Sequence, residues 1–529
     1  MIRIHQLKLA IGCTEEDIKN KIIKVLKINN NELEEYFIVK RSIDARKKDN
    51  IQYIYVVDAR VKNEERVLKR AASKDIVKAP IEAYLMPQSG QMELKTRPVI
   101  IGAGPAGLFC AYLLAQSGYA PLVLERGETV ESRTKKVEAF WNGEPLDVKT
   151  NVQFGEGGAG TFSDGKLNTM VKDPKGRIRK VLETFAEFGA PSEILYLNKP
   201  HIGTDVLKTV VVNMRNAIIE MGGEFKFGCQ VTDFVFDGDR IRAVKTADGE
   251  EIAAQNVILA IGHSARDTFR RLHELDVDMQ QKAFAVGVRI EHPQELINFA
   301  QYGEKFMDKL PAADYKLTAR SSDERGVYSF CMCPGGYVVN ASSEEGMLAV
   351  NGMSYHARDS RNANSAIIVA VRPEDFGSAD ALAGVEFQRK LEGAAYRYGG
   401  GSIPVQLYGD FKRRSVSTDY GDVLPCIKGG TKFADLNDIL PDYICNALKE
   451  GIDYFGTRIE GYSRYDAVLS GVESRTSSPV RICRDDGFES SIKGLFPCGE
   501  GAGYAGGITS AAVDGLKLAE EIIRRYKPL

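Results

Sequence analysis

The chain has 529 residues, too many for one hydrophobic core, and this length predicts two to four domains. Its 43% apolar and 27% charged residues are ordinary for a soluble globular protein. The net charge of −2 gives no general attraction to nucleic acid or to an anionic membrane, and no apolar run is long enough to cross a bilayer. Nine cysteines and an N-terminus unlike a signal peptide favour reduced thiols and a cytoplasmic location.

The first 95 residues predict a small α+β module that resembles a ferredoxin-like sandwich. Its expected elements are a strand at 3–9, a helix at 14–26, a β-hairpin formed by 37–45 and 52–60, and a helix at 63–72. The module has 19 Lys and Arg against 14 Asp and Glu. We interpret this excess as the solvated basic face of an accessory or dimerising module, because no surface aromatics alternate with the basic residues as RNA contact would require.

A dinucleotide-binding motif follows a linker at 85–97. Residues 99–125 read as a buried strand, the turn Gly102-Ala-Gly104-Pro-Ala-Gly107, an apolar helix and a second strand that ends on Glu125. Gly102 permits the tight turn, Gly104 lets the backbone approach a pyrophosphate, and Gly107 lets the helix pack on the strand. Glu125 can accept a hydrogen bond from a ribose hydroxyl. The motif predicts that a dinucleotide binds.

A second glycine-rich segment, 154–166, also matches the glycine spacing, but neither a buried strand before it nor a good helix after it supports a second such motif. We expect a loop close to the cofactor, because its many glycines permit positive φ or close backbone approach to a ligand. Farther on, 224–237 and 240–246 predict strands and a hairpin, and 256–263 predicts a buried strand. After a mixed region with irregular loops, the chain closes with a strand, a glycine-rich loop and a helix at 509–526.

These separated segments resemble the flavoproteins with two dinucleotide-binding domains of the glutathione-reductase-like class. The resemblance implies that the first motif holds the ADP part of FAD, that Glu500 takes the role of the acid that binds the ribityl chain, and that a helix beginning near Gly507 points at the flavin. It also implies that the backbone of Val231 meets the adenine. Two residues depart from that pattern: Glu500 replaces Asp, and Ile261 replaces Thr.

At finer grain, residues 95–529 resemble an uncharacterised family of bacterial FAD-dependent dehydrogenases, a family that the N-terminal module also fits. The matching segments are 155–166, 262–267, 331–336, 351–360 and the closing Gly499-Glu500-Gly501-Ala-Gly503-Tyr-Ala-Gly506-Gly507-Ile508. The resemblance implies FAD as cofactor and leaves the substrate open.

The motifs and the resemblance together predict a Rossmann-type FAD domain built from separated segments, a mixed α+β substrate domain and the N-terminal module. The expected division is an accessory module at 1–95, FAD-binding segments at 96–150, 190–265 and 490–529, a cofactor-proximal glycine-rich region at 151–189, and a substrate domain at 266–489. The expected cofactor-binding residues are Gly102, Gly104, Pro105, Ala106, Gly107, Glu125, Arg126, Arg133, Gly157, Gly158, Lys166, Val231, Ala260, Gly262, Gly499, Glu500, Gly507 and Ile508.

Three side chains are candidates for catalysis. His356 and Arg358 fall on one face if their segment is extended, where an imidazole beside a cation can bind an anion or donate a proton. A surface loop or a core histidine is an equal alternative for His356, and His263 is the third candidate. We interpret Cys331 and Cys333 as buried structural cysteines, because neither a Cys-x-x-Cys nor a Cys-x4-Cys pair follows the first motif. No metal site is expected, because no second Cys/His pair has ligand spacing.

We therefore predict an FAD-dependent oxidoreductase that transfers hydride between flavin N5 and a small organic substrate. Since no second Rossmann motif stands between 190 and 490, any NAD(P)H would dock transiently over the flavin. Two alternatives stay open: a flavoprotein that acts on tRNA through the basic module, and a non-enzymatic FAD-binding redox sensor or scaffold. Nucleic acid is not an expected partner, and the sequence leaves the oligomeric state open.

Overall fold

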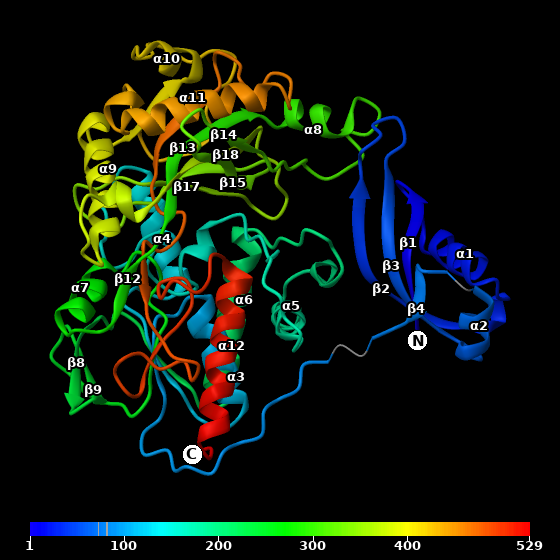
Figure 1. Cartoon of the computed structure of the whole chain (residues 1–529), viewed down its shortest axis with the longest axis horizontal. Coiled ribbons are helices and arrows are strands. Elements are labelled where there is room, and N and C mark those ends of the chain that lie inside the picture. Colours follow the sequence, from blue (N-terminus) through cyan, green and yellow to red (C-terminus); the bar gives the residue numbers. More distant parts are fainter. Residues whose placement is uncertain (72, 81–82) are drawn as a thin grey trace.

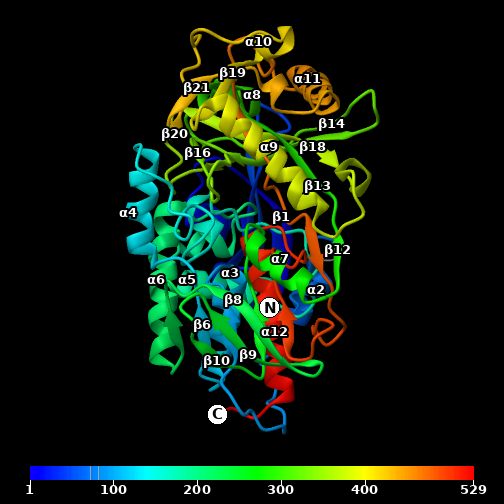
Figure 2. The same ribbon diagram turned by 90° about the vertical axis from the view of Figure 1, so that its left-hand side faces the viewer.

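The computed structural model describes residues 1–71, 73–80 and 83–529. Figure 1 shows a small N-terminal module in blue beside a larger body, in which a seven-stranded sheet lies above a parallel sheet. Figure 2 shows that these two parts of the body are stacked along its long dimension. Each part has its own apolar core, as expected for a chain of this length. The residue boundaries that we assigned to the domains stay a prediction.

The N-terminal module has the ferredoxin-like fold that the sequence predicts. Its elements are β1 (Ile2–Ala10), α1 (Glu15–Leu26), β2 (Leu33–Asp44), β3 (Gln52–Val61), α2 (Glu64–Ala71) and β4 (Ile76–Lys78), and the antiparallel sheet has the order β2-β3-β1-β4. Thr14 caps α1, because its hydroxyl accepts the Asp17 amide at 3.2 Å while the Asp17 carboxylate accepts the Thr14 amide at 2.8 Å. The last residue of the helix predicted over 63–72, Ala72, lies outside the described residues.

The linker contacts the C-terminal end of the last helix, α12 (Ile508–Arg525). The Gly90 amide donates to the Ile523 carbonyl at 2.8 Å, and the Met92 amide donates to the Arg525 carbonyl at 3.1 Å. Gly90 is required here, because a Cβ would lie 2.3 Å from the Arg524 carbonyl oxygen. The linker therefore ties the N-terminal module to the last helix of the chain.

The dinucleotide motif lies in a five-stranded, wholly parallel sheet that segments distant in sequence build together. Its order is β24 (Leu495–Pro497), β11 (Val257–Leu259), β5 (Val99–Ile101), β6 (Leu122–Leu124) and β7 (Glu224–Lys226). Alternate residues of β5 face opposite cores: Ile100 packs with α3 (Pro105–Gln116), α6 (Thr204–Glu220) and α12, and Ile101 packs with the opposite layer. That opposite layer comprises β8 (Val231–Asp237), β9 (Arg240–Thr246), β10 (Glu251–Ala253) and α7 (Arg266–Glu274). The predicted Rossmann-type fold built from separated segments is confirmed.

The second part of the body is built on a mixed seven-stranded sheet. Its order is β14 (Thr318–Arg320), β15 (Gly326–Cys333), β18 (Asn362–Val371), β13 (Phe284–Pro293), β22 (Val468–Glu473), β19 (Ile403–Leu407) and β21 (Thr431–Phe433), and β19·β21 is its parallel pair. Helices α8 (Gln294–Tyr302), α9 (Ala383–Gly399), α10 (Tyr408–Arg413) and α11 (Asp442–Gly456) contribute to its core. As Figure 1 shows, α10 and α11 lie on the outer side and leave the other side toward the parallel sheet. The predicted mixed α+β domain is confirmed.

Short elements complete and join these parts. A three-stranded sheet has the order β17 (Val350–Met353), β16 (Tyr337–Asn340) and β20 (Ile427–Lys428). Strands β12 (Met279–Gln281) and β23 (Val480–Ile482) pair where the chain enters and leaves the large sheet. Helices α4 (Val130–Trp141) and α5 (Arg177–Glu187) flank the glycine-rich region. Across the described parts of the chain, no helix combines the length and the apolar character that a membrane span needs.

Candidate functional site

A cavity of about 990 Å³ lies between the parallel sheet and the large sheet. It opens at the carboxyl ends of β5, β6, β11 and β24, which is where ligands bind in open parallel sheets. The large sheet contributes residues of β15 and the segment 473–477 to the same cavity. The cavity therefore joins the predicted cofactor elements to side chains from the predicted substrate domain.

The turn between β5 and α3 forms a cradle that only small residues can make. Gly102 has φ +104°, and a Cβ on Gly107 would lie 1.9 Å from the Gly102 carbonyl oxygen. Gly107 thus packs the helix on the strand and does not line the cavity, unlike Gly102, Gly104, Pro105 and Ala106. A Cβ on Gly104 would meet nothing nearer than 3.8 Å, so the space above it is open to a ligand. The free N–H groups at the start of α3 fit an anionic pyrophosphate there.

Glu125, at the end of β6, lines the cavity and is held rigidly. Its carboxylate accepts the amides of Ala103 at 2.8 Å, Gly127 at 2.9 Å and Gly155 at 3.0 Å. The neighbouring Arg126 stacks on the Phe154 ring at 4.3 Å. The carboxylate thus connects the nucleotide turn to the glycine-rich segment, and it is placed to accept a ribose hydroxyl.

Arg133 supports the glycine-rich segment from inside and does not line the cavity. Its buried guanidinium donates to the carbonyls of Asn151 at 2.8 Å, Val152 at 2.8 Å, Glu156 at 2.6 Å and Gly158 at 2.9 Å. The hydrogen bonds of its guanidinium all go to residues 151–158, so the expected direct contact of Arg133 with the cofactor is corrected. Burial lowers the pKa of Arg133 to about 10, and the carbonyls compensate for its lost hydration.

Within the loop that Arg133 holds, Gly158 and Lys166 line the cavity, and Gly157 does not. Gly157 packs against Thr161, because a Cβ there would lie 2.1 Å from the threonine hydroxyl. Its expected cofactor contact is therefore corrected to a packing role.

The closing loop and α12 bring Glu500, Gly507 and Ile508 to the cavity. Gly499 packs under them: its amide donates to Asp514 at 2.8 Å, and a Cβ would lie 2.8 Å from the Ala106 Cβ. Gly499 thus fits two helices together and does not line the cavity, contrary to expectation.

Burial raises the pKa of Glu500 to about 7, and the charge of Lys282 opposes that rise. The remaining predicted cofactor residues that line the cavity are Arg126, Val231, Ala260 and Gly262.

His263 lines the cavity beside Glu500, with 3.8 Å between its Nε2 and the carboxylate. Its Nδ1 lies 2.9 Å from the Ser264 hydroxyl. Burial and the charges of Arg475 and Arg266 lower the pKa of His263 to about 3. The imidazole is neutral at pH 7, and it offers a hydrogen bond to a ligand rather than a positive charge.

His356 and Arg358 do not line the cavity, and their segment is a turn rather than an extended strand. The Arg358 amide donates to the Tyr355 carbonyl at 3.1 Å, and Arg358 has φ +52°. His356 stacks on His201 with 5.2 Å between ring centroids, and its Nδ1 lies 2.9 Å from the Ile202 carbonyl. The expected shared face is therefore corrected, because alternation holds only in extended backbone.

Arg358 instead supports the cavity wall through Asp164, which is not among the site residues predicted from the sequence. Asp164 accepts Arg358 at 3.0 and 2.5 Å and Lys166 at 2.6 Å. Burial raises the pKa of Asp164, but the charges and hydrogen bonds of Lys166 and Arg358 outweigh it and lower the pKa to about 2. Lys166 also donates to the Met332 carbonyl. The ionised Asp164 thus holds the Lys166 ammonium at the wall.

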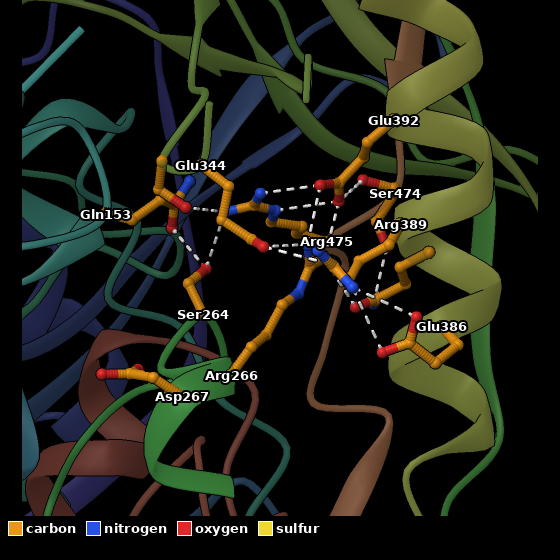
Figure 3. Close-up of polar contacts among 12 residues, drawn as sticks. Gln153, Ser264, Arg266, Asp267, Glu344, Glu386, Arg389, Glu392, Ser474 and Arg475 are labelled. Atoms are coloured by element: carbon orange, nitrogen blue, oxygen red, sulfur yellow. Dashed lines mark hydrogen bonds and ion pairs between the residues drawn. The ribbon is translucent and has the colours of Figure 1, made fainter. Parts of the chain in front are cut away.

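A second ionic network fixes the cavity wall from the large-sheet side (Figure 3). Arg475, which lines the cavity, donates to both Glu392 carboxylate oxygens at 3.0 and 2.8 Å. Arg266, from α7, donates to the same carboxylate at 2.7 and 2.9 Å. Figure 3 shows Glu392 on α9 between the two guanidinium groups. Glu392 therefore couples the two parts of the body beside the cavity.

Asp164, Lys282, Glu392 and Arg475 are functional candidates that are not among the residues predicted from the sequence. Asp164 and Lys166 stand in the glycine-rich segment as Ser-Asp-Gly-Lys, where the acid two residues before the lysine was a usable signal. Arg475 and Glu392 carry no local signal, because 83 residues separate them. Among the described residues, no group of three His, Cys, Asp or Glu side chains is placed to hold a metal ion.

Comparison with known proteins identifies the parts of this chain. Residues 283–476 match the family "FAD-dependent protein, C-terminal domain-like", residues 100–158 match an NAD(P)-binding Rossmann-like domain, and residues 1–60 match a domain of unknown function. An uncharacterized protein from Clostridium beijerinckii is 50% identical over 530 residues, which cover 99% of each chain.

Solved structures give remote likenesses. A halogenase in complex with FAD is 11% identical with a TM-score of 0.38, covering 80% of this chain and 69% of that one. L-proline dehydrogenase from P. horikoshii is 12% identical with a TM-score of 0.34, covering 82% and 93%. Glycine oxidase from Bacillus cereus is 12% identical with a TM-score of 0.30, covering 81% and 95%. By its full-length identity and its matched domains, the chain belongs with the Clostridium protein to a family of FAD-dependent proteins, and its cofactor is FAD.

Proposed function

We propose that this flavoprotein is an oxidoreductase that transfers a hydride between flavin N5 and a small organic substrate. The observation that carries the proposal is the single cavity shared by the FAD-binding elements and the large sheet. Bound FAD supplies the two-electron chemistry, and the chain must bind it, orient the substrate and manage protons. The residues at the two ends of the cavity are suited to these tasks.

At the cofactor end, two helices begin at the cavity. Gly104 precedes α3 and Gly507 precedes α12, and a glycine has no side chain that could cap the first N–H groups. The positive ends of these helix dipoles favour the pyrophosphate and the negative charge that a reduced flavin carries. Glu125 and Glu500 add acceptors for ribose and ribityl hydroxyls.

At the substrate end, Lys166 offers a positive charge and a proton donor. Asp164 and the Met332 carbonyl hold its ammonium group at the wall, 29% exposed. Such a fixed ammonium can bind a carboxylate or carbonyl oxygen and can exchange a proton with it. Lys166, rather than His356 or Arg358, is therefore our candidate for this role.

Reduced nicotinamide is the electron donor to test first. Within the described residues, one parallel sheet of five strands carries the dinucleotide turn, and our proposal assigns that turn to FAD. We propose that NAD(P)H, if it reduces the flavin, docks transiently at the substrate end of the cavity. The tRNA alternative gains no support, since the rings on the central strands of the module, Tyr53 and Tyr55, pack into apolar cores.

The test is anaerobic titration of the FAD-loaded protein with NADH, NADPH and panels of amino acids, amines and hydroxy acids, followed by flavin absorbance. Hydride transfer predicts bleaching by at least one donor and a slower rate with the deuterated donor. Lys166→Met should lower that rate at least tenfold with FAD content unchanged, and Lys135→Met on the exposed face of α4 is the matched control. A protein that holds FAD but reacts with no donor and no organic acceptor would favour the redox-sensor alternative.

A further inference from the structure

Two cysteines face the FAD cavity from β15. Cys331 is exposed to the cavity, and Met332 and Cys333 line it as well. The interpretation of Cys331 as a buried structural cysteine is therefore wrong, because burial in a strand core requires a side chain that turns away from open space. Both thiols stand at the site and have no part in the proposed hydride step.

An irregularity of the backbone brings the three consecutive residues to the cavity. The pairing of β15 with β18 shifts register between Phe330 and Cys333, and Cys331 has φ +41°. In a regular strand, neighbouring side chains point to opposite faces, so a bulge is needed for all three to line one cavity. A non-glycine residue at positive φ is strained, and such strain gathers at functional sites. The Cys333 thiol donates to the Cys331 carbonyl at 3.3 Å, so it is turned back toward the first cysteine.

Positive charges surround this pair. The buried Arg289 guanidinium donates to the Cys331 carbonyl at 3.1 Å and lies 4.0 Å from the Cys333 sulfur. Glu473 at 2.8 Å and Asn364 at 2.7 Å hold Arg289 in place, and Lys166 binds the Met332 carbonyl. Fixed cations stabilise the thiolate that forms when a disulfide opens. Reduced hydration at the cavity wall opposes them and raises the pKa of Cys331 to about 12, so the reduced pair rests as neutral thiols.

The glycine-rich segment 154–166, together with the adjacent Leu167, connects the thiols to the cofactor end of the cavity. A Cβ on Gly160 would lie 3.0 Å from the Ile508 side chain at the start of α12, and the Thr509 hydroxyl donates to the Leu167 carbonyl at 2.7 Å. Lys166 is part of this loop and reaches the Met332 carbonyl. The segment that contacts the start of α12 thus also contacts Met332, the residue between the two cysteines.

We propose that Cys331 and Cys333 form a redox-active pair that exchanges two electrons with the FAD bound in this cavity. In the reductive direction the bond between the two sulfurs breaks, and each sulfur takes up one electron and one proton. The two electrons and one proton come from the reduced flavin, and the second proton comes from solvent. The reverse step forms the disulfide from two thiols and reduces the flavin. The proposal deepens the proposed function, because it names a disulfide inside the site as the acceptor.

The test is an electron count. FAD-loaded protein, oxidised with a small disulfide and freed of it, is titrated anaerobically with dithionite. Wild type should consume four electrons per FAD, whereas Cys331→Ser and Cys333→Ser should consume two. Cys483→Ser, at a cysteine that does not line the cavity, is the matched control and should consume four. Alkylation and mass spectrometry should find a 331–333 disulfide in the oxidised protein and two labelled thiols after reduction.

Two electrons per FAD in wild type, with both cysteines alkylated after oxidation, would overturn the proposal. The wild-type count decides the question even if a serine variant fails to retain FAD. Because dithionite reduces the flavin without a hydride donor, the count does not depend on the proposed function. A protein that no organic donor reduces but that takes up four electrons would refute the hydride step and keep the redox pair.

Discussion

Arg475 and Glu392 form a bidentate, deeply buried ion pair, with the Glu392 side chain at 0% exposure and Arg475 at 5%. Arg266 binds the same carboxylate from the other part of the body. A buried charge that loses its partner is costly, and breaking such a pair typically destabilises a protein by about 3–5 kcal/mol. Replacing Glu392 alone by a neutral residue should therefore destabilise the contact between the two parts of the body beside the cavity.

Glu392→Gln should therefore lower the free energy of unfolding by about 3–5 kcal/mol and weaken FAD binding, because the amide leaves two guanidinium groups without their shared countercharge. Denaturant unfolding and FAD fluorescence measure the two effects. Glu386→Gln is the control on the same helix: Glu386 pairs with Arg389 and Arg270 at the surface, and its loss should cost less than about 1 kcal/mol. Equal midpoints for the two variants would contradict the role of Glu392.

Two glycines of one motif should respond in opposite ways to alanine. In Gly104→Ala the new Cβ meets nothing within 3.8 Å, and the native φ is negative, so the apoprotein should remain stable. The methyl group occupies the space above the start of α3, and the dissociation constant for FAD should rise at least tenfold, about 1.4 kcal/mol. In Gly107→Ala the Cβ would lie 1.9 Å from a carbonyl oxygen, so the apoprotein itself should lose stability. Thermal unfolding of the apoproteins and FAD titration separate the two. A stable Gly107→Ala apoprotein would refute the packing role.

Local pattern predicted the elements around the dinucleotide turn well, because each of them is encoded in a short segment. A strand, a glycine turn, a helix and a second strand ending at Glu125 follow one another within 27 residues, and each has its own sequence signature. The closing helix was expected at 509–526 and lies at Ile508–Arg525. For the same reason the antiparallel N-terminal module was predicted from the order of its elements.

The substrate end was predicted poorly, because backbone irregularity and long-range pairing decide it. The positive φ of Arg358 turns the segment that was read as extended, and the bulge at Cys331 exposes a thiol that alternation would place differently. The charge of Arg133 predicts a ligand contact, yet five carbonyl groups of residues 151–158 accept the hydrogen bonds of its guanidinium from a different segment of the chain. The sequence pattern of helix α4 alone cannot show that Arg133 binds the carbonyl groups of another segment.

Glu500 should make apoprotein stability depend on pH. Its folded-state pKa of about 7 lies above the usual 4.5, so the folded protein binds more protons than the unfolded chain between these values. The contribution of Glu500 to stability therefore falls as pH rises from about 4.5 to 7, by at most about 3 kcal/mol. The effect should be smaller in practice, since 25% of the side chain is exposed.

Glu500→Gln removes this titration. Relative to wild type, the variant should gain stability above pH 7 and match it near pH 4. Denaturant unfolding of both apoproteins across that range measures the difference. Parallel curves at all pH values would show that Glu500 does not carry the raised pKa, and buried Glu156 and Glu291, which remain in both proteins, cancel in the comparison.

Arg133→Lys tests whether residues 151–158 are held by the geometry of the guanidinium or only by a positive charge. Lysine keeps the charge but has three donors on one nitrogen, which cannot reach the carbonyl groups of residues 151–158 that the planar fork binds. Hydrogen bonds of charged groups contribute about 1.5–3 kcal/mol each, so the loss of two should lower the free energy of unfolding by about 3–6 kcal/mol.

Hydrogen exchange should rise in residues 151–158 before it rises elsewhere, and FAD affinity should fall because Gly155 and Gly158 line the cavity. Lys135→Ala, on the exposed face of the same helix, should change stability by less than about 0.5 kcal/mol. If Arg133→Lys leaves exchange in this loop unchanged, charge alone suffices and the guanidinium geometry is not what holds the loop.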